Sequence, residues 1–509
     1  RPLSVISGGP GTGKTTTVRK VLALLFAQWQ AAHGATDSTD FTGIAPLVAL
    51  AAPTGKAATR MEEATREGVD ALQEQAGKAA CEWLKSLRPS TLHRLLNQVR
   101  PGRNGASHLP HDIVLVDEAS MIDLALMRRL VEAVRPDARL ILLGDRDQLA
   151  SVAAGTVLAD LTRDAGPSGM RFGTRMADRI REIAPSVELA GKAVEQAPAL
   201  ADGVVQLLTS HRAEADSGVW AVMDSIARAQ RTASSDAESR RARDALLDRA
   251  TLLLTASSSE EREGFGDLTF FPHEVRKEQG IAWEATRLSS DAAKKMVEGW
   301  LPIVSAARTR EYDHVALLAM LESFRVLAAH RRGALGVEGL NELIGRAVAS
   351  RLLGGDAAAE TPDEWTRAPA LPHDFVGRPV IVTENRYDVQ RMNGDVGIVV
   401  APASGRRTAR VAFPGREGTA VEYLDLPAMP PHETVFAMTI HKSQGSQFTH
   451  TMIVLPARAS RILTRELVYT AVTRSRSHVS LAGTREVLRE ALGRTVQRAS
   501  TLGSLLWGR

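Results

Sequence analysis

The feature that most constrains this chain is a glycine-rich segment close to its first residue. An apolar run at residues 3–7 leads into Gly8-Gly9-Pro10-Gly11-Thr12-Gly13-Lys14-Thr15-Thr16, and a helix-favouring segment follows. This Gly-x-x-x-x-Gly-Lys-Thr spacing between a strand and a helix is typical of a phosphate-binding loop, whose backbone N–H groups and helix N-terminus face an anion. In such a loop Lys14 reaches the β- and γ-phosphates of ATP, and the Thr15 hydroxyl holds Mg²⁺. The alternative is a plain glycine-rich turn.

The composition limits the classes of protein to which the chain can belong. Its 509 residues exceed what one hydrophobic core supports, so we expect about two to four domains. The isoelectric point near 9.3 suits a polyanionic partner, although a solvated basic surface would give the same value. Cys81 is the one cysteine and no run approaches ~20 apolar residues, so we expect a cytoplasmic protein without a membrane span. Because the chain opens at Arg1, almost on the first strand, we also expect native sequence upstream.

Two further segments of the first half carry polar residues suited to a nucleic-acid backbone. The apolar run at residues 47–52 ends in Pro53-Thr54-Gly55-Lys56, and ligands bind at the carboxyl ends of parallel strands. Thr54 and Lys56 could contact a backbone there; the alternative is a helix N-cap and a solvated lysine. Residues 90–96 begin another helix with Ser90 or Thr91 as its N-cap, and the local pattern predicts a packing or capping role for His93 rather than a catalytic one.

A pair of adjacent carboxylates supplies what hydrolysis at a phosphate loop needs. The strand at residues 111–116 ends in Asp117-Glu118. Asp117 would complete the Mg²⁺ shell, and Glu118 would polarise the attacking water. Such a pair at a strand end can also be only a helix N-cap.

The strand at residues 139–143 ends in a second polar loop, Gly144-Asp145-Arg146-Asp147-Gln148. Gln148 can sense the γ-phosphate and the attacking water, and Asp145 can hydrogen-bond within the loop. Four strand–loop–helix units are then present, which predicts a doubly wound α/β domain that closes near residue 203.

The second half returns to the α/β pattern after an interruption. We predict a new strand at residues 206–212 that ends in Arg212, followed by a helical stretch. From residue 374 short β segments separated by turn signals predict a small β-barrel, and from residue 433 the α/β pattern resumes with a helix that carries Arg474 at its end. The predicted domains are 1–203, 204–373 with a helical insert, 374–432 and 433–509, the second and fourth forming one lobe.

The first lobe offers no cation besides Lys14 for the transition state of hydrolysis. Arg212 and Arg474 end a predicted strand and a predicted helix of the second lobe. An arginine that reaches the phosphates across a cleft contributes ~10³–10⁵ in rate, which would make hydrolysis conditional on closure. Opening and closing could then ratchet the two lobes along a bound strand.

In this order the motifs resemble those of superfamily 1 helicases, and most closely the RecD family, the α subunits of RecBCD enzymes (exodeoxyribonuclease V). The matching segments are the phosphate loop and residues 52–58, 90–96, 117–121, 144–151, 439–445 and 463–476. The resemblance implies two RecA-like P-loop NTPase domains in tandem with an inserted SH3-like β-barrel. It also implies a 5′-to-3′ DNA motor that uses ATP and Mg²⁺ on single strands and duplex ends in double-strand break repair and recombination. RecB-like and RecC-like partners are implied as well, with any nuclease activity in a partner subunit.

The resemblance further implies roles for individual residues. Those for the nucleotide are Gly8, Gly9, Pro10, Gly11, Thr12, Gly13, Lys14, Thr15, Thr16, Gln148, Arg212, Gly445, Gln447 and Arg474. Lys14, Asp117, Glu118, Gln148, Arg212 and Arg474 would be catalytic, and Thr15 and Asp117 would bind Mg²⁺. Those for single-stranded DNA are Pro53, Thr54, Lys56, Thr91, His93, Thr439, His441 and Lys442. Two positions depart from the family pattern: His211 replaces the usual tyrosine, and Gln447 replaces the usual glutamate, so its bond to a ribose would be weaker.

Other activities stay open at the level of the sequence. A nucleotide-dependent clamp would bind nucleic acid without travelling, and a stand-alone or RNA-directed superfamily 1 helicase would carry the same motifs. A small-molecule kinase would share only the phosphate loop. Glu118 disfavours a pure switch, which needs no water-activating carboxylate, and Gln148 together with the second lobe and its arginines disfavours a kinase. The choice of DNA over RNA follows from the resemblance alone.

Overall fold

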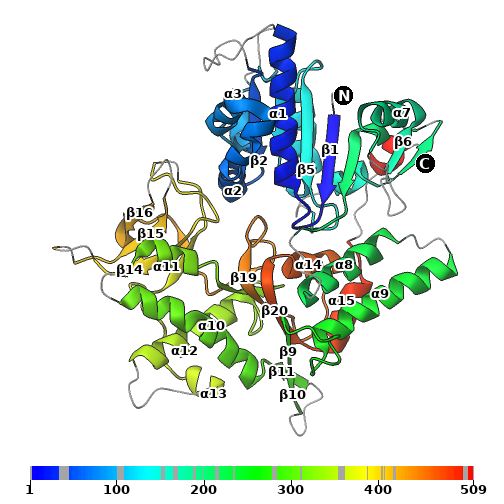
Figure 1. Cartoon of the computed structure of the whole chain (residues 1–509). Coiled ribbons are helices and arrows are strands. Elements are labelled where there is room, and N and C mark those ends of the chain that lie inside the picture. Colours follow the sequence, from blue (N-terminus) through cyan, green and yellow to red (C-terminus); the bar gives the residue numbers. More distant parts are fainter. Residues whose placement is uncertain are drawn as a thin grey trace. The chain divides into compact units, whose positions relative to one another are not determined.

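The computed structural model describes residues 3–33, 45–99, 108–150, 155–163, 170–186, 191–195, 197–198, 200–211, 217–232, 236–277, 284–309, 312–353, 361–386, 388–402, 405, 407–415, 420–496 and 502–507. The chain forms two compact units, residues 1–214 with 497–509 and residues 215–496, each with its own parallel sheet (Figure 1). Among the described residues, no helix combines the length and the apolar character needed to cross a bilayer.

The first unit is built on a six-stranded parallel sheet in the order β3-β2-β4-β5-β1-β8. Its strands are β1 (Leu3–Gly8), β2 (Val48–Ala52), β3 (Ser90–Thr91), β4 (Ile113–Val116), β5 (Arg139–Gly144) and β8 (Val204–Leu207). Its helices are α1 (Lys14–His33), α2 (Gly55–Arg66), α3 (Gln73–Ser86), α4 (Leu92–Leu96), α5 (Leu124–Ala133), α6 (Val157–Leu161), α7 (Thr174–Ile183) and α16 (Leu502–Trp507). A separate parallel pair joins β6 (Met170–Gly173) and β7 (Gly191–Val194).

Successive side chains of a strand point to opposite faces of the sheet, so the core of the first unit has two parts, one on each face. Ile6 packs in a buried cluster that includes residues of α1, α2 and α3, while its neighbour Val5 packs in a cluster with residues of α4, α5 and α6. Because both faces are covered, β4 is buried along its whole length, as expected for a parallel sheet. The polar residues after each strand therefore gather at one edge of the sheet.

Two segments predicted for the second lobe belong to the first unit. Strand β8 pairs in parallel with β1, from Val204 opposite Val5 to Leu207 opposite Gly8, so the predicted boundary at 203/204 was wrong. Residues 497–509 also belong to the first unit, where α16 packs on α6, so the last predicted domain does not extend to residue 509. A local sequence pattern identifies a strand or a helix, but it does not show against which sheet edge or helix the segment will pack.

The second unit contains a five-stranded parallel sheet in the order β18-β12-β19-β20-β9. Its strands are β9 (Leu268–Pro272), β12 (Phe324–Ala328), β18 (Ala437–Thr439), β19 (Phe448–Val454) and β20 (Ser475–Gly483). Its helices are α8 (Gly218–Arg231), α9 (Ala237–Thr255), α10 (Ser290–Arg308), α11 (His314–Met320), α12 (Val337–Leu353), α13 (Pro362–Trp365), α14 (Arg465–Val472) and α15 (Arg485–Gly493). An antiparallel hairpin of β10 (Glu274–Lys277) and β11 (Glu284–Arg287) precedes α10.

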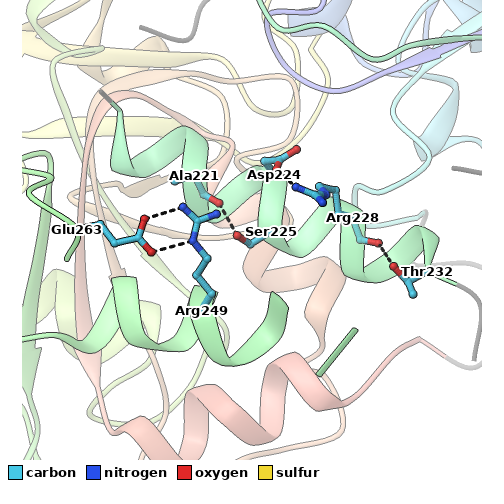
Figure 2. A network of polar contacts seen from close by, with 7 residues as sticks. All are labelled: Ala221, Asp224, Ser225, Arg228, Thr232, Arg249 and Glu263. Atoms are coloured by element: carbon cyan, nitrogen blue, oxygen red, sulfur yellow. Dashed lines mark hydrogen bonds and ion pairs between the residues drawn. The ribbon is translucent and has the colours of Figure 1, made fainter. Parts of the chain in front are cut away.

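Helices α8 and α9 pack against each other where the chain enters the second unit. Asp267, just before β9, accepts hydrogen bonds from the backbone N–H groups of Gly218 and Val219 at 2.9 and 3.1 Å, so its negative charge lies at the N-terminus of α8. Figure 2 shows the Arg249 guanidinium of α9 donating to both carboxylate oxygens of Glu263 at 2.9 and 2.7 Å. Since these two side chains are 38% and 41% exposed, the pair orients the turn after α9 and adds little stability.

The predicted barrel at 374–432 corresponds to an antiparallel sheet in the order β16-β15-β14-β13-β17 (Figure 1). Its strands are β13 (Pro379–Val382), β14 (Val396–Val400), β15 (Arg410–Pro414), β16 (Val421–Asp425) and β17 (His432–Thr434). Within the described residues the edge strands β16 and β17 do not pair with each other. An inserted antiparallel sheet is therefore observed, whereas a closed barrel is not, and its SH3-like character stays a prediction.

Candidate nucleotide and nucleic-acid sites

The phosphate loop connects β1 to α1 in the setting that the sequence predicts. Gly11 and Gly13 adopt φ angles of +76° and +80°, which residues other than glycine rarely adopt. The Lys14 Nζ donates hydrogen bonds to the carbonyl oxygens of Gly8 and Gly9 at 2.5 and 2.9 Å. The Thr12 hydroxyl donates to the Gly9 oxygen at 2.8 Å. These bonds hold the ammonium within the loop.

Helix α1 begins directly behind this loop. The Thr17 N–H and hydroxyl both donate to the Gly13 carbonyl, at 2.8 and 3.0 Å, and close the first turn. The N–H groups at the start of a helix have no acceptor within the helix and, with the helix dipole, favour a bound anion. Thr15 is half-buried and Thr16 is exposed in this first turn.

Asp117 and Glu118 follow β4, which lies two strands away from β1 in the sheet. The Asp117 carboxylate accepts a hydrogen bond from the Glu118 N–H at 2.7 Å. Glu118 has a left-handed backbone (φ 51°, ψ 38°), a strained conformation for a residue with a side chain and one that is enriched at functional sites. Burial and the neighbouring charge of Glu118 raise the pKa of Asp117 to about 6, and the positive charge of Lys14 opposes that rise.

The residues present fit a magnesium-bound nucleotide. The loop supplies backbone donors and one ammonium for phosphate oxygens, and Thr15 and Asp117 supply the hydroxyl and carboxylate oxygens that Mg²⁺ prefers. The raised pKa of Asp117 shows that its negative charge is poorly compensated by the protein. A divalent cation beside this carboxylate would compensate that charge.

We expect the Asp117→Asn variant to be more stable than the parent chain at pH 7.5 without nucleotide or Mg²⁺. The pKa of Asp117 lies near 6 in the folded chain and near 3.8 in the unfolded one. Between these values only the folded chain keeps the proton, so stability falls as the pH rises through this window. For this partly exposed group the penalty at pH 7.5 is on the order of 1–2 kcal/mol, which asparagine removes.

Thermal unfolding at pH 7.5 and at about pH 5 measures this effect, because the gain should shrink as Asp117 becomes protonated. Asp137→Asn is the matched control, since the Asp137 side chain is 76% exposed. Equal or lower stability of Asp117→Asn at pH 7.5 would contradict the prediction.

The loop after β5 is held by hydrogen bonds within the loop and by one to β1. The Gln148 side-chain amide donates to the Asp145 carboxylate at 3.1 Å, and the Asp147 N–H donates to the other oxygen of that carboxylate at 3.0 Å. The Arg146 N–H lies 3.3 Å from the Ser7 hydroxyl of β1. Asp145 thus orients Gln148, in agreement with the prediction that Asp145 bonds within this loop.

Strand order brings the nucleotide residues of the first unit together. β4, β5 and β1 are neighbours, so Asp117-Glu118, Asp145–Gln148 and the phosphate loop follow adjacent strands at the carboxyl edge of one sheet. Beyond β8, the Ser210 hydroxyl donates to the Pro10 carbonyl at 3.3 Å, and the His211 N–H donates to the Gly11 carbonyl at 2.8 Å. Arg212 lies outside the described residues.

The residues predicted for DNA in the first unit follow β2 and β3 at the same edge. Ala52, next to Pro53, is paired with Thr91. Thr54 and Thr91 are N-caps whose side chains accept hydrogen bonds from the N–H groups of Ala57 and Arg94. The capping alternative is therefore observed for Thr54, and the predicted N-cap is observed at Thr91. His93 is exposed, whereas Pro53 and Lys56 are half-buried.

In the second unit, Arg474 lies beside the residues that precede β19. Its guanidinium donates to the carbonyl oxygens of Thr470 and Ser446, each at 3.1 Å, and to the Thr473 hydroxyl at 3.2 Å. Arg474 is only 3% exposed. Because Gly445 (φ +69°) and Gln447 flank Ser446, the structure brings the nucleotide residues predicted for this unit to the amino-terminal ends of β19 and β20.

Thr439 is instead the last residue of β18, and His441 and Lys442 follow that strand. The Lys442 N–H donates to the Thr439 hydroxyl at 3.2 Å, while the Lys442 ammonium lies 3.6 Å from the Glu433 carboxylate. Glu433 also pairs with Arg331 at 2.6 Å. The sequence analysis missed Glu433, because its partners lie on segments whose proximity no local spacing reveals.

Comparisons with known proteins match both units. Family models described as "AAA domain" and "UvrD-like helicase C-terminal domain" match residues 1–154 and 434–482. The chain is 36% identical over 510 residues to the RecBCD enzyme subunit RecD of Mycolicibacterium smegmatis, covering 98% of this chain and 72% of that protein. It is 32% identical over 514 residues to RecBCD enzyme subunit RecD of Haemophilus influenzae, covering 99% and 70%. A crystal structure of Bacteroides Pif1 bound to ssDNA has a TM-score of 0.41 and 16% identity, with 96% of this chain and 90% of that chain covered.

Proposed function

The chain belongs to the RecD family of RecBCD enzyme subunits, and from this premise we propose that it is an ATP-driven motor that moves 5′-to-3′ along single-stranded DNA. Family membership supports a helicase motor. The direction of travel, the DNA substrate and the role in double-strand break repair and recombination are parts of the proposal.

The observation that carries the proposal is the arrangement at the carboxyl edge of the first sheet. Loops after β1, β5 and β4 hold the residues suited to a nucleotide, and loops after the adjoining β2 and β3 hold those suited to a DNA backbone. A conformational change caused by ATP binding or hydrolysis could therefore reach the proposed DNA-binding residues through neighbouring strands of one sheet. This adjacency is what a motor needs and what a small-molecule kinase does not.

In the proposed mechanism Lys14 and the loop N–H groups bind the phosphates. Mg²⁺ on Thr15 and Asp117 would polarise the phosphate oxygens when bound. Glu118 accepts a proton from the attacking water, and Gln148, oriented by Asp145, positions that water. Each role uses a residue of the first unit.

Arg212 and Arg474 are proposed to stabilise the charge that develops on the transferred phosphoryl group. A planar guanidinium suits phosphate oxygens because it donates several hydrogen bonds at once. The Arg474 guanidinium is braced by the backbone around Ser446, which gives it a defined orientation. Gly445 and Gln447, on either side of that contact, are proposed to bind the nucleotide.

DNA contacts are proposed on both units. Pro53, Thr54, Lys56, Thr91 and His93 would contact the strand from the first unit. Thr439, His441 and Lys442 would contact it from the second. Since most of these side chains offer hydroxyl, imidazole or ammonium groups, they would bind the sugar–phosphate backbone and read little sequence.

We also propose that the chain works in the cytoplasm with RecB-like and RecC-like subunits on duplex ends. The names of the relatives support such an assembly. Nuclease activity would belong to a partner subunit. The inserted antiparallel sheet is proposed to be the SH3-like element that the family resemblance implies.

The test is ATP hydrolysis with and without single-stranded DNA, followed by a polarity assay. Streptavidin is bound to biotin at either end of a single strand, and its displacement reports the direction of travel. We expect DNA-stimulated hydrolysis and displacement from the 3′ end only, because a 5′-to-3′ motor runs into that end. Displacement from the 5′ end would contradict the direction, and DNA binding with stimulated hydrolysis but no displacement from either end would favour a clamp.

A further inference from the structure

The last helix of the chain packs into the core of the first unit. In α16, Trp507 is only 6% exposed, and its indole Nε1 donates a hydrogen bond to the Asp160 carbonyl of α6 at 2.8 Å. Leu502 and Leu506 of α16 pack against the buried cluster on the α4–α6 face of the sheet. α16 thus covers α6.

Helix α6 in turn touches the loops of the proposed nucleotide site. The Arg146 guanidinium, from the loop that carries Gln148, donates to the Thr162 carbonyl at the end of α6 at 2.7 Å. A Cβ added at Gly144 would lie 2.6 Å from Cδ2 of Leu158, so α6 lies directly against the end of β5. α6 also packs on the short 3₁₀ turn Ala119–Met121, immediately after Glu118.

The carbonyl groups at the end of α6 connect α16 to the Gln148 loop. The last carbonyls of a helix have no donor within that helix and need donors from elsewhere. The Asp160 carbonyl accepts a long bond from the Arg163 N–H at 3.4 Å and a shorter one from the Trp507 indole at 2.8 Å. Arg146 donates to the Thr162 carbonyl, so α16 and the Gln148 loop are both bonded to the end of α6. A helix as short as α6 is not stable alone, and its position depends on these contacts.

We propose that Trp507 is a positioning residue for ATP hydrolysis. By fixing α6, it holds the loop of Gln148 and the turn after Glu118 in the geometry that activates water. The proposal rests on the function proposed above, but it requires only hydrolysis and not travel along DNA. Because Trp507 acts on the nucleotide loops through its bond to α6, its loss should slow turnover more than it weakens binding.

The test compares three variants of the full chain in steady-state ATP hydrolysis, with and without single-stranded DNA. We expect Trp507→Ala to lower kcat about tenfold in both conditions while KM for ATP stays within about twofold. Trp507→Phe keeps most of the packing and loses the indole donor, so its loss should be about threefold. Leu505→Ala is the matched control, because Leu505 lies on the same helix and is 78% exposed.

The outcomes separate the possibilities. Each variant is titrated with a tightly bound fluorescent nucleotide, so that kcat refers to folded sites only. Unchanged kcat per folded site in both Trp507 variants overturns the inference, as does a rise in KM that matches the loss in kcat/KM. If the parent chain hydrolyses ATP normally but is not stimulated by DNA, the proposed motor function is contradicted. The comparison of the Trp507 variants then still tests the inference about hydrolysis. Absence of any hydrolysis in the parent chain overturns both proposals.

Discussion

ATP hydrolysis by the Lys14→Ala variant is expected to fall to the background of the assay, with or without single-stranded DNA. Lys14 is the cation that the phosphate loop itself carries, and its Nζ lies 2.5 and 2.9 Å from the carbonyl oxygens of Gly8 and Gly9. Alanine removes the positive charge for the β- and γ-phosphates and leaves the backbone donors of the loop. Residual nucleotide binding with no turnover is therefore the expected result.

The measurement is phosphate release at saturating ATP, with circular dichroism to confirm folding. Lys20→Ala is the matched control, because Lys20 lies on the same helix and is exposed. It should hydrolyse ATP at the parental rate. If Lys14→Ala were folded and turned over at that rate as well, the loop would not be the catalytic nucleotide site.

The parts of the candidate site whose place in the fold could be predicted are those encoded by adjacent residues. The phosphate loop, Asp117-Glu118 and the Gln148 loop each follow an apolar strand, and all three strands form where expected. A strand followed at once by polar residues places those residues at a sheet edge whatever the rest of the fold does. Local pattern was therefore sufficient to find these groups, although it did not show that β4, β5 and β1 are neighbours.

The parts that the sequence did not predict depend on contacts between distant segments. A strand was predicted at residues 206–212 of the second lobe, but the observed strand β8 ends at Leu207 and pairs with β1 of the first unit. The helical stretch expected after Arg212 is interrupted, because strands β10 and β11 pair before α10, which begins only at Ser290, where Ser289 caps it. Nothing near Trp507 indicates that its partner is the Asp160 carbonyl.

The same distinction applies to the two arginines of the second half. Arg212 and Arg474 were predicted to have the same role because each stands at the predicted end of a strand or helix. The structure adds a physical environment for Arg474, whose guanidinium is held by the Thr470 and Ser446 carbonyls. For the guanidinium to reach a phosphate, some of these hydrogen bonds must be broken or shared with the phosphate oxygens. The role of Arg474 therefore needs a direct test.

Arg474→Ala is expected to lower kcat for ATP hydrolysis by about 10³-fold or more while nucleotide binding stays nearly intact. An arginine that acts on the transition state contributes little to the ground state, so kcat and kcat/KM should fall together. Arg474→Lys keeps the charge but loses the planar fork, and we expect it to recover only a small part of the rate. Stopped assays with and without DNA, together with nucleotide binding, measure these quantities.

Arg476→Ala is the matched control for this prediction. Arg476 lies two positions further along the chain, on β20, and its 45% exposed side chain pairs with Glu322 at 2.8 Å, a surface ion pair that contributes little to stability. Its loss should leave kcat unchanged. Because Arg474 also satisfies buried carbonyl groups, its variants are compared by thermal unfolding as well, and a loss of rate that only follows the loss of folded protein would indicate a structural role. Parental kcat in a folded Arg474→Ala chain would remove Arg474 from catalysis and leave Lys14 and Arg212 as the cations proposed for the transition state.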